Sequence, residues 1–169
     1  MSDEPEAKGQ RSKSTRHPSP VSRQPSTGTV LAFDFGTKRI GVAVGDFETR
    51  LAHPLAAIAS VENRARFATI GRLIAEWRPV RLVVGLPRHA DGSEHPVGKL
   101  ARRFAQRLEG RFSTRTELVD ERLTSREAEG LLRAAGARGA RLKAGLDPLA
   151  AQRILQAYFE CVSGDIVIP

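Results

Sequence analysis

Three acidic positions in this sequence stand where they could hold a metal ion. The first is Asp34, which interrupts the apolar run VLAFDFGTKRIGVAVGD over 30–46. The second is the pair Asp120 and Glu121 in LVDERLTS, and the third is Asp147 in GLDPLAAQRIL. Mg²⁺ and Mn²⁺ prefer oxygen ligands, and two such ions about 3.5–4 Å apart can promote hydrolysis of a phosphodiester. Together these positions predict a metal site for phosphoryl transfer.

Asp34 is the most informative of these residues. Alternate side chains of a strand share a face, so Val30, Ala32 and Asp34 are expected to point the same way. An ionised carboxylate on a buried face costs several kcal/mol unless a partner compensates it. That partner could be a backbone or arginine donor, or a metal ion at the edge of the sheet. Gly36 would allow a tight turn beside this point.

The other acidic positions also have simpler explanations. Asp147 precedes Pro148 and would be a good N-cap of the last helix, a contribution of about 1 kcal/mol. Either residue of the 120–121 pair could form an ion pair with Arg122 or Arg126. The spacing of the acidic residues alone therefore leaves both a structural and a functional interpretation open.

The elements that would position these residues alternate between strands and helices. Apolar, β-rich runs predict strands at 30–35, 39–45, 52–59, 81–86 and 115–119. Helical spacing, a capping box at TSRE and the Asp147-Pro148 pair predict helices at 63–77, 96–109, 124–136 and from 147 onward. This order predicts an α/β fold with a mixed central sheet, an antiparallel meander plus parallel strands, flanked by helices. An RNase H-like fold is one of several with that outline.

Composition predicts one domain with a tail at each end. Residues 1–28 are rich in Ser, Pro and charge and predict a disordered basic tail, 29–162 the domain, and 163–169 a short C-terminal tail. We expect no membrane span and no secretory signal. Cys161 is the only cysteine, which excludes an internal disulfide and favours a reducing, cytoplasmic location.

Charge points to a polyanionic partner. The chain has 27 Lys and Arg against 19 Asp and Glu, a formal net charge of +8. Such a balance favours nucleic acid, although a solvated basic surface is the simpler alternative. The candidate nucleic-acid contacts are Lys38, Arg39, Arg88, Arg122, Arg138, Arg141 and Lys143. The last three belong to GARGARLKAGL, which we expect to be a flexible loop before Asp147. A basic face is expected on the helix over 96–109, from Lys99, Arg102, Arg103 and Arg107.

Four motifs in order resemble those of the YqgF/RuvX family. They are FDFGTKRIGVAVGD, VVGLPRHADGSEHP, VDERLTSREA and DPLAAQRILQAYFE, and they cover about 29–160. These relatives are Holliday-junction-resolvase-like proteins, also described as nucleases of the 16S rRNA precursor. The resemblance implies an RNase H-like fold, a nuclease that requires Mg²⁺ or Mn²⁺, two ions in its site, and a role at the 5′ end of pre-16S rRNA.

Carried over by motif, the resemblance implies three catalytic and metal-binding residues: Asp34, Glu121 with Asp120 as the fallback, and Asp147. Related resolvases also carry an acidic residue at the end of the fourth strand, where this chain has VVGLP. That departure weighs against cleavage of four-way DNA junctions.

Three other functions stay open at this point. A Holliday junction resolvase would need two sites in a dimer, a silent RNase H-like module would only bind nucleic acid, and a nucleotide-binding ATPase would need a second domain. The sequence does not decide between RNA and DNA, between endonuclease and exonuclease, or between monomer and homodimer. Partner proteins on the ribosome precursor are compatible with it.

Overall fold

The computed structural model describes residues 27–59, 62–89, 91–121 and 139–163, with only the backbone described over 139–145. The described elements are β1 (Thr29–Phe35), β2 (Arg39–Asp46), β3 (Ala52–Ala59), α1 (Asn63–Trp77), β4 (Arg81–Leu86), α2 (Pro96–Phe112), β5 (Thr116–Asp120) and α4 (Gly139–Ser163). The predicted helix over 124–136 and residues 1–26 of the predicted tail over 1–28 lie outside the described residues, as do Arg122 and Arg138.

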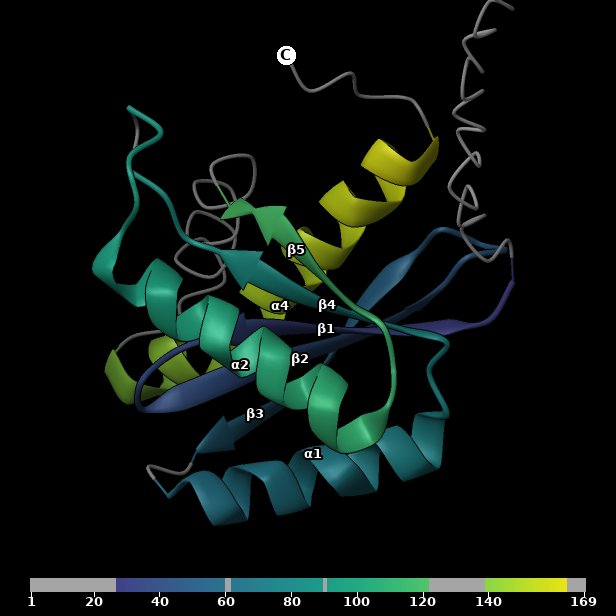
Figure 1. The fold of residues 1–169 in the computed structure, drawn as a ribbon, viewed down its shortest axis with the longest axis horizontal. Helices are drawn as coiled ribbons and strands as arrows, with labels where there is room; N and C mark the ends of the chain where they lie inside the picture. The colour runs from purple at the N-terminus through teal and green to yellow at the C-terminus, as the bar shows by residue number, and fades with distance from the viewer. Residues whose placement is uncertain (1–26, 60–61, 90, 122–138, 164–169) are drawn as a thin grey trace, which may run out of the picture.

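The five strands form one mixed sheet in the order β3-β2-β1-β4-β5 (Figure 1). β1 pairs antiparallel with β2, and β2 antiparallel with β3. β4 lies parallel to β1, and β5 parallel to β4. The predicted α/β class and mixed sheet are confirmed. Pro54 lies on the outer strand β3, where a missing backbone N–H is tolerated, and the β2–β3 register shifts beside it.

Helices cover both faces of the sheet, with α1 and α2 on one face and α4 on the other (Figure 1). Leu31 and Phe33 of β1 belong to the core under α1 and α2, whereas Val30 and Ala32 belong to the core under α4. All four are fully buried. Burial on both faces explains why β1 is apolar at nearly every position, as is usual for a central strand.

The last helix differs from the prediction. We expected it to begin at Asp147, but α4 begins at Gly139 and contains Pro148 in its interior. Pro148 removes one helical hydrogen bond, and the Asp-Pro pair is a strong local signal for a helix start. Packing of α4 across β1, β2 and β3 overrides this signal. The backbone at Arg141 and Lys143 is therefore helical, not the loop we predicted.

No helix within the described ranges is long and apolar enough to cross a membrane.

Candidate active site

Asp34 lies at the end of β1 and faces α4, on the same side as Val30 and Ala32. Its nearest neighbours in the sheet on that side are glycines. Gly41 of β2 is its direct partner in the antiparallel ladder, and Gly85 of β4 lies beyond Val84, the partner of Phe33. Burial raises the pKa of Asp34 to about 6, and the negative charge of Asp147 adds to the increase. Asp34 is therefore a carboxylate that resists ionisation unless a cation lies nearby.

Glu121 immediately follows β5 and brings its carboxylate over the bare backbone of Gly85. A Cβ on Gly85 would collide with Glu121 Oε1 and with the Ile154 side chain of α4. Burial raises the pKa of Glu121 to about 7, and the charges of Asp34 and Asp120 contribute to the increase. Gly85 thus gives Glu121 the space to approach Asp34.

Asp147 reaches the same place from α4. A Cβ on Gly41 would collide with the Asp147 backbone, so α4 crosses β2 at this glycine. Arg39 Nε lies 2.6 Å from Asp147 Oδ2. That buried oxygen nevertheless has no hydrogen-bond partner among the described residues, because the N–H is not aligned with it. The contact is therefore a charge interaction with Arg39.

Asp120 faces away from this group and toward the β4–α2 loop. Arg88 Nε lies 3.7 Å from Asp120 Oδ2. The charge of Asp34 contributes to the raised pKa of Glu121, which places the Glu121 carboxylate near Asp34. The geometry therefore favours Glu121 over the fallback Asp120 as the residue that acts with Asp34. Arg88 is one arginine partner of Asp120, and the suggested partners Arg122 and Arg126 lie outside the described residues.

The arrangement partly fits a divalent metal. Within the part of the chain that the structure describes, no three His, Cys, Asp or Glu side chains are already close enough to enclose an ion. Two observations nevertheless favour one. Asp147 Oδ2 is a buried acceptor without a hydrogen bond, and Asp34 and Glu121 carry raised pKa values that a cation would lower. A donor set made only of carboxylate oxygens suits Mg²⁺ or Mn²⁺ and not a soft metal.

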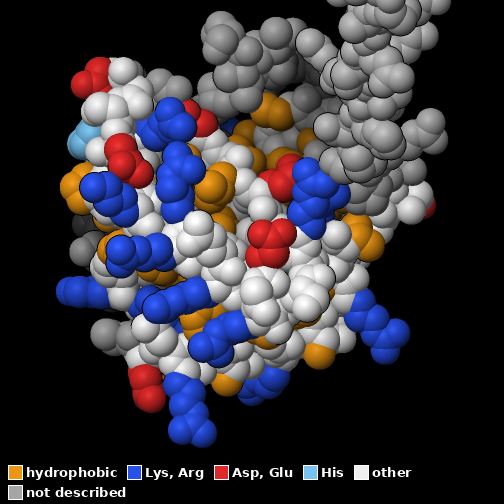
Figure 2. All heavy atoms as spheres, viewed as in Figure 1, with side chains coloured by type: hydrophobic (Ala, Val, Ile, Leu, Met, Phe, Trp, Pro, Cys, Tyr) orange, Lys and Arg blue, Asp and Glu red, His pale blue; other side chains and the backbone are white. Residues whose placement is uncertain are grey.

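The predicted basic residues differ in their distance from the acidic group and in how much of each the structure describes. Arg39 and Arg88 border the acidic residues and are paired with Asp147 and Asp120. Lys38 is exposed at the tip of the β1–β2 turn. Of Arg141 and Lys143 only the backbone is described, so their side chains are not placed. The predicted basic face of α2 is present, and Figure 2 shows Lys and Arg side chains gathered on the face over that helix.

Sequence reasoning missed the two glycines that make room for the acidic residues. Gly41 and Gly85 stand in strand interiors, where glycine weakens a strand and often marks a close approach of other atoms. That signal was present in RIGVAVGD and RLVVGL. What approaches each glycine comes from distant parts of the chain, and only the folded structure identifies it as Asp147 and Glu121.

Comparisons with known proteins identify sequences related to this chain. A family model described as "RuvX: Holliday junction resolvase" matches residues 28–161. A protein of Nitrosospira multiformis named "Putative pre-16S rRNA nuclease" is 55% identical over 137 residues, which cover 81% of this chain and 91% of the relative. A protein of the same name from Chromobacterium violaceum is 56% identical over 131 residues, covering 77% of this chain and 96% of the relative.

A solved structure supports the fold. The structure of Thermus thermophilus RuvC in complex with a Holliday junction substrate superposes with a TM-score of 0.50 at 16% sequence identity. The match covers 81% of this chain and 96% of that one. At this identity the likeness concerns the fold alone, and it confirms the predicted RNase H-like architecture.

Proposed function

This chain belongs to the RuvX family, and on that premise we propose that it is a divalent-metal-dependent nuclease that processes the 5′ end of the 16S rRNA precursor. The observation that carries the proposal is the convergence of Asp34, Glu121 and Asp147 on one face of the sheet, each from a different element. Relatives that share more than half of their aligned residues with this chain carry the name "Putative pre-16S rRNA nuclease". We place the reaction in the cytoplasm.

The three carboxylates would hold the metal. Asp34 is the central residue, because its charge couples to both Asp147 and Glu121. Mg²⁺ or Mn²⁺, as two ions, would supply activation of the attacking water and stabilisation of the leaving oxygen. Binding of a cation would lower the raised pKa values of Asp34 and Glu121 and so favour their ionised forms at neutral pH.

The cations around the acidic residues would bind the substrate backbone. Arg39 and Arg88 each hold one carboxylate at the edge of the group, and Lys38 extends from the neighbouring turn. Arginine suits phosphate oxygens because its planar guanidinium donates two parallel hydrogen bonds. With Asp147 engaged as a metal ligand, Arg39 would be free to donate to a phosphate. These residues would thus position the scissile group over Asp34.

Cleavage of a four-way DNA junction is the second candidate. The family description names a Holliday junction resolvase, and a solved RuvC shares the fold. Against it, β4 ends in VVGL, followed by Pro87, without the acidic residue that related resolvases carry there. We therefore rank the RNA substrate first.

The test is cleavage of a labelled fragment spanning the 5′ end of pre-16S rRNA and of a four-way DNA junction, side by side. Each substrate is incubated with the protein in Mn²⁺, in Mg²⁺ and in EDTA. We expect metal-dependent cleavage of the RNA and not of the junction. Cleavage of the junction alone would move the function to DNA recombination, and binding without cleavage of either would favour a silent module.

A further inference from the structure

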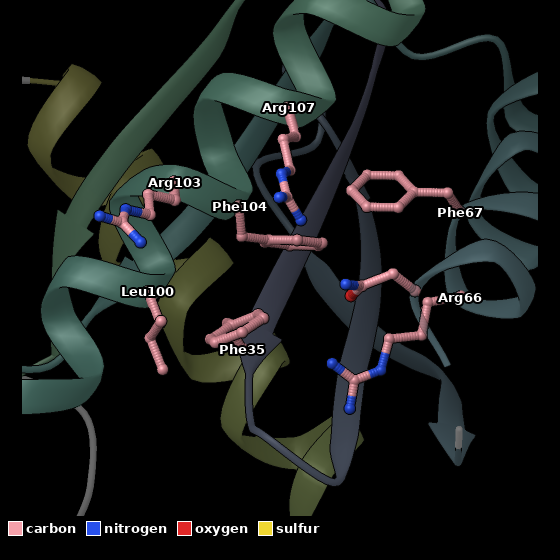
Figure 3. A pocket seen from close by; sticks show the side chains of 8 residues that line it. Phe35, Arg66, Phe67, Leu100, Arg103, Phe104 and Arg107 are labelled. Carbon is pink, nitrogen blue, oxygen red and sulfur yellow. The ribbon is translucent and has the colours of Figure 1, made fainter. Parts of the chain in front are cut away.

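A second pocket lies on the opposite face of the sheet from the acidic residues. It has a volume of about 170 Å³ and is bounded by the end of β1, the first half of α1 and the middle of α2 (Figure 3). Its aromatic residues are Phe35, Phe67 and Phe104, and its charged residues are Arg66, Arg103 and Arg107. None of the residues that line it is acidic. Nothing in the proposed chemistry of Asp34 requires this pocket.

The floor of the pocket is an aromatic surface fixed by the core. The rings of Phe35 and Phe104 lie 5.0 Å apart and are inclined by 33°. Phe104 is in turn packed between Phe33 and Phe67, with each pair of ring centroids 5.9 Å apart. Phe104 and Phe67 are buried, whereas Phe35 is partly exposed and Leu100 beside it is 40% exposed. Phe35 therefore offers a ring face that is held in place before any ligand arrives.

The rim of the pocket is cationic. Arg103 and Arg107 are exposed, and neither forms an ion pair within the described parts of the chain. Figure 3 shows the Arg107 side chain descending from α2 beside the ring of Phe104. Arg66 of α1 donates to the carbonyl of Thr37, so a third guanidinium is anchored at the opposite side. A ligand of this pocket needs a flat apolar part for the floor and a negative charge for the rim.

The pocket and the acidic residues are joined through β1. Asp34 and Phe35 are consecutive and so point to opposite faces of the sheet. The turn over 36–38 is flanked by an arginine contact on each face of the sheet. Arg66 donates to the carbonyl of Thr37 on the pocket side, and Arg39 pairs with Asp147 on the other side. A chain that passes over this end of the sheet would contact both sites at once.

We propose that this pocket binds one nucleotide of a single-stranded segment of the substrate, with its base on Phe35 and its phosphate between Arg103 and Arg107. A nucleotide combines the planar apolar group and the anion that the pocket requires, and bases stack well on aromatic side chains next to arginine. The inference rests on the proposed nuclease function, and it specifies that the RNA is single-stranded next to the cleaved bond. It also supplies the aromatic platform for a base that the sequence alone did not reveal.

The test measures affinity separately from cleavage. Fluorescence anisotropy follows binding of a short labelled single-stranded oligoribonucleotide, a single-stranded oligodeoxyribonucleotide, an RNA duplex and adenosine monophosphate in EDTA, where a metal-dependent nuclease does not cut. The variants are Phe35→Leu, which removes the ring, and Arg107→Gln, which removes one rim charge. Arg72→Gln is the matched control, since Arg72 is exposed on α1 outside the pocket. Circular dichroism verifies the fold of each variant.

We expect Phe35→Leu to weaken both single strands by roughly 5- to 100-fold and to leave the duplex unchanged, because a paired base cannot stack on the ring. Arg107→Gln should reduce the salt dependence of single-strand binding by about 0.7 in the slope of log K against log salt, and Arg72→Gln should not. Measurable binding of the free nucleotide but not of the strands would overturn the assignment to a substrate segment.

Wild-type single-strand affinity in both pocket variants would also overturn the inference, as would an equal loss for duplex and single strand. Neither result would affect the proposed nuclease function, which is judged by metal-dependent cleavage in the wild type. Conversely, if the proposed nuclease function is wrong, the wild type will not cleave RNA, while the pocket variants will still bind single strands more weakly than the wild type.

Discussion

Gly41→Ala tests how closely α4 must approach the sheet. A Cβ built on Gly41 would lie 1.8 Å from the carbonyl oxygen of Asp147, whereas such atoms essentially never come within 3.0 Å. Since the obstructing atom is backbone, the side chain cannot move aside, and α4 must shift by about 1 Å or more. That shift carries Asp147 away from Asp34.

Two consequences follow for the Gly41→Ala protein. Overpacking of this kind costs about 1–3 kcal/mol of unfolding free energy. A displacement of about 1 Å at a catalytic group can lower the rate by about 100-fold. We expect urea unfolding to show the first effect and metal-dependent cleavage, measured where the variant is fully folded, to show the second.

Gly110→Ala is the matched control, because nothing lies within 4 Å of a Cβ at that exposed position of α2. It should gain about 0.5–1 kcal/mol, as expected for alanine in place of glycine in a helix, with unchanged cleavage. Wild-type stability and wild-type cleavage in Gly41→Ala would refute the reasoning, since α4 could not then lie against β2 at Asp147.

Three further predictions concern stability. In EDTA the free energy of unfolding should fall between about pH 4 and about pH 7. The folded-state pKa values of Asp34 (about 6) and Glu121 (about 7) lie above their unfolded values, so stability that is present at low pH is lost as pH rises through this range. Each residue contributes about 1–3 kcal/mol to the fall after allowance for partial exposure, and Asp34→Asn should show a smaller fall in urea titrations. Mn²⁺ should raise the melting temperature of the wild type and not that of Asp34→Asn, as a calorimetric scan would reveal. Glu117→Ala should lose about 3–5 kcal/mol in urea unfolding, because it leaves the buried guanidinium of Arg81 without the carboxylate 2.5 Å away, and a loss under about 1 kcal/mol would contradict this.

Local patterns were sufficient to predict most of the fold. The alternation around Asp34 predicted that its side chain shares a face with Val30 and Ala32, and the apolar runs located every described strand to within one residue at its ends. The α4 start was wrong because the Asp147-Pro148 pair is a local cap signal, while the position of the helix is decided by its packing on the sheet.

Less of the candidate site than of the fold could be predicted from the sequence. Asp120 and Glu121 are neighbours in the chain, and only the structure separates them, one toward Arg88 and the other toward Asp34. The pocket at Phe35 was missed for the same reason, since its aromatic floor and its arginines come from three elements that are distant in sequence. Contacts between distant segments carry no local pattern that could have predicted them.

The central claim is that Asp34 and its neighbouring carboxylates hold the metal that cleaves RNA. It is tested most directly by comparing the wild type, Asp34→Asn and the exposed control Glu76→Gln on a labelled pre-16S rRNA fragment in Mn²⁺. We predict that Asp34→Asn folds and binds the fragment with unchanged affinity. Its cleavage rate should fall by more than about 100-fold, because loss of a residue that only supports a metal ligand already costs roughly 10- to 100-fold. Glu76→Gln should cleave like the wild type. Wild-type cleavage by pure Asp34→Asn would contradict the account.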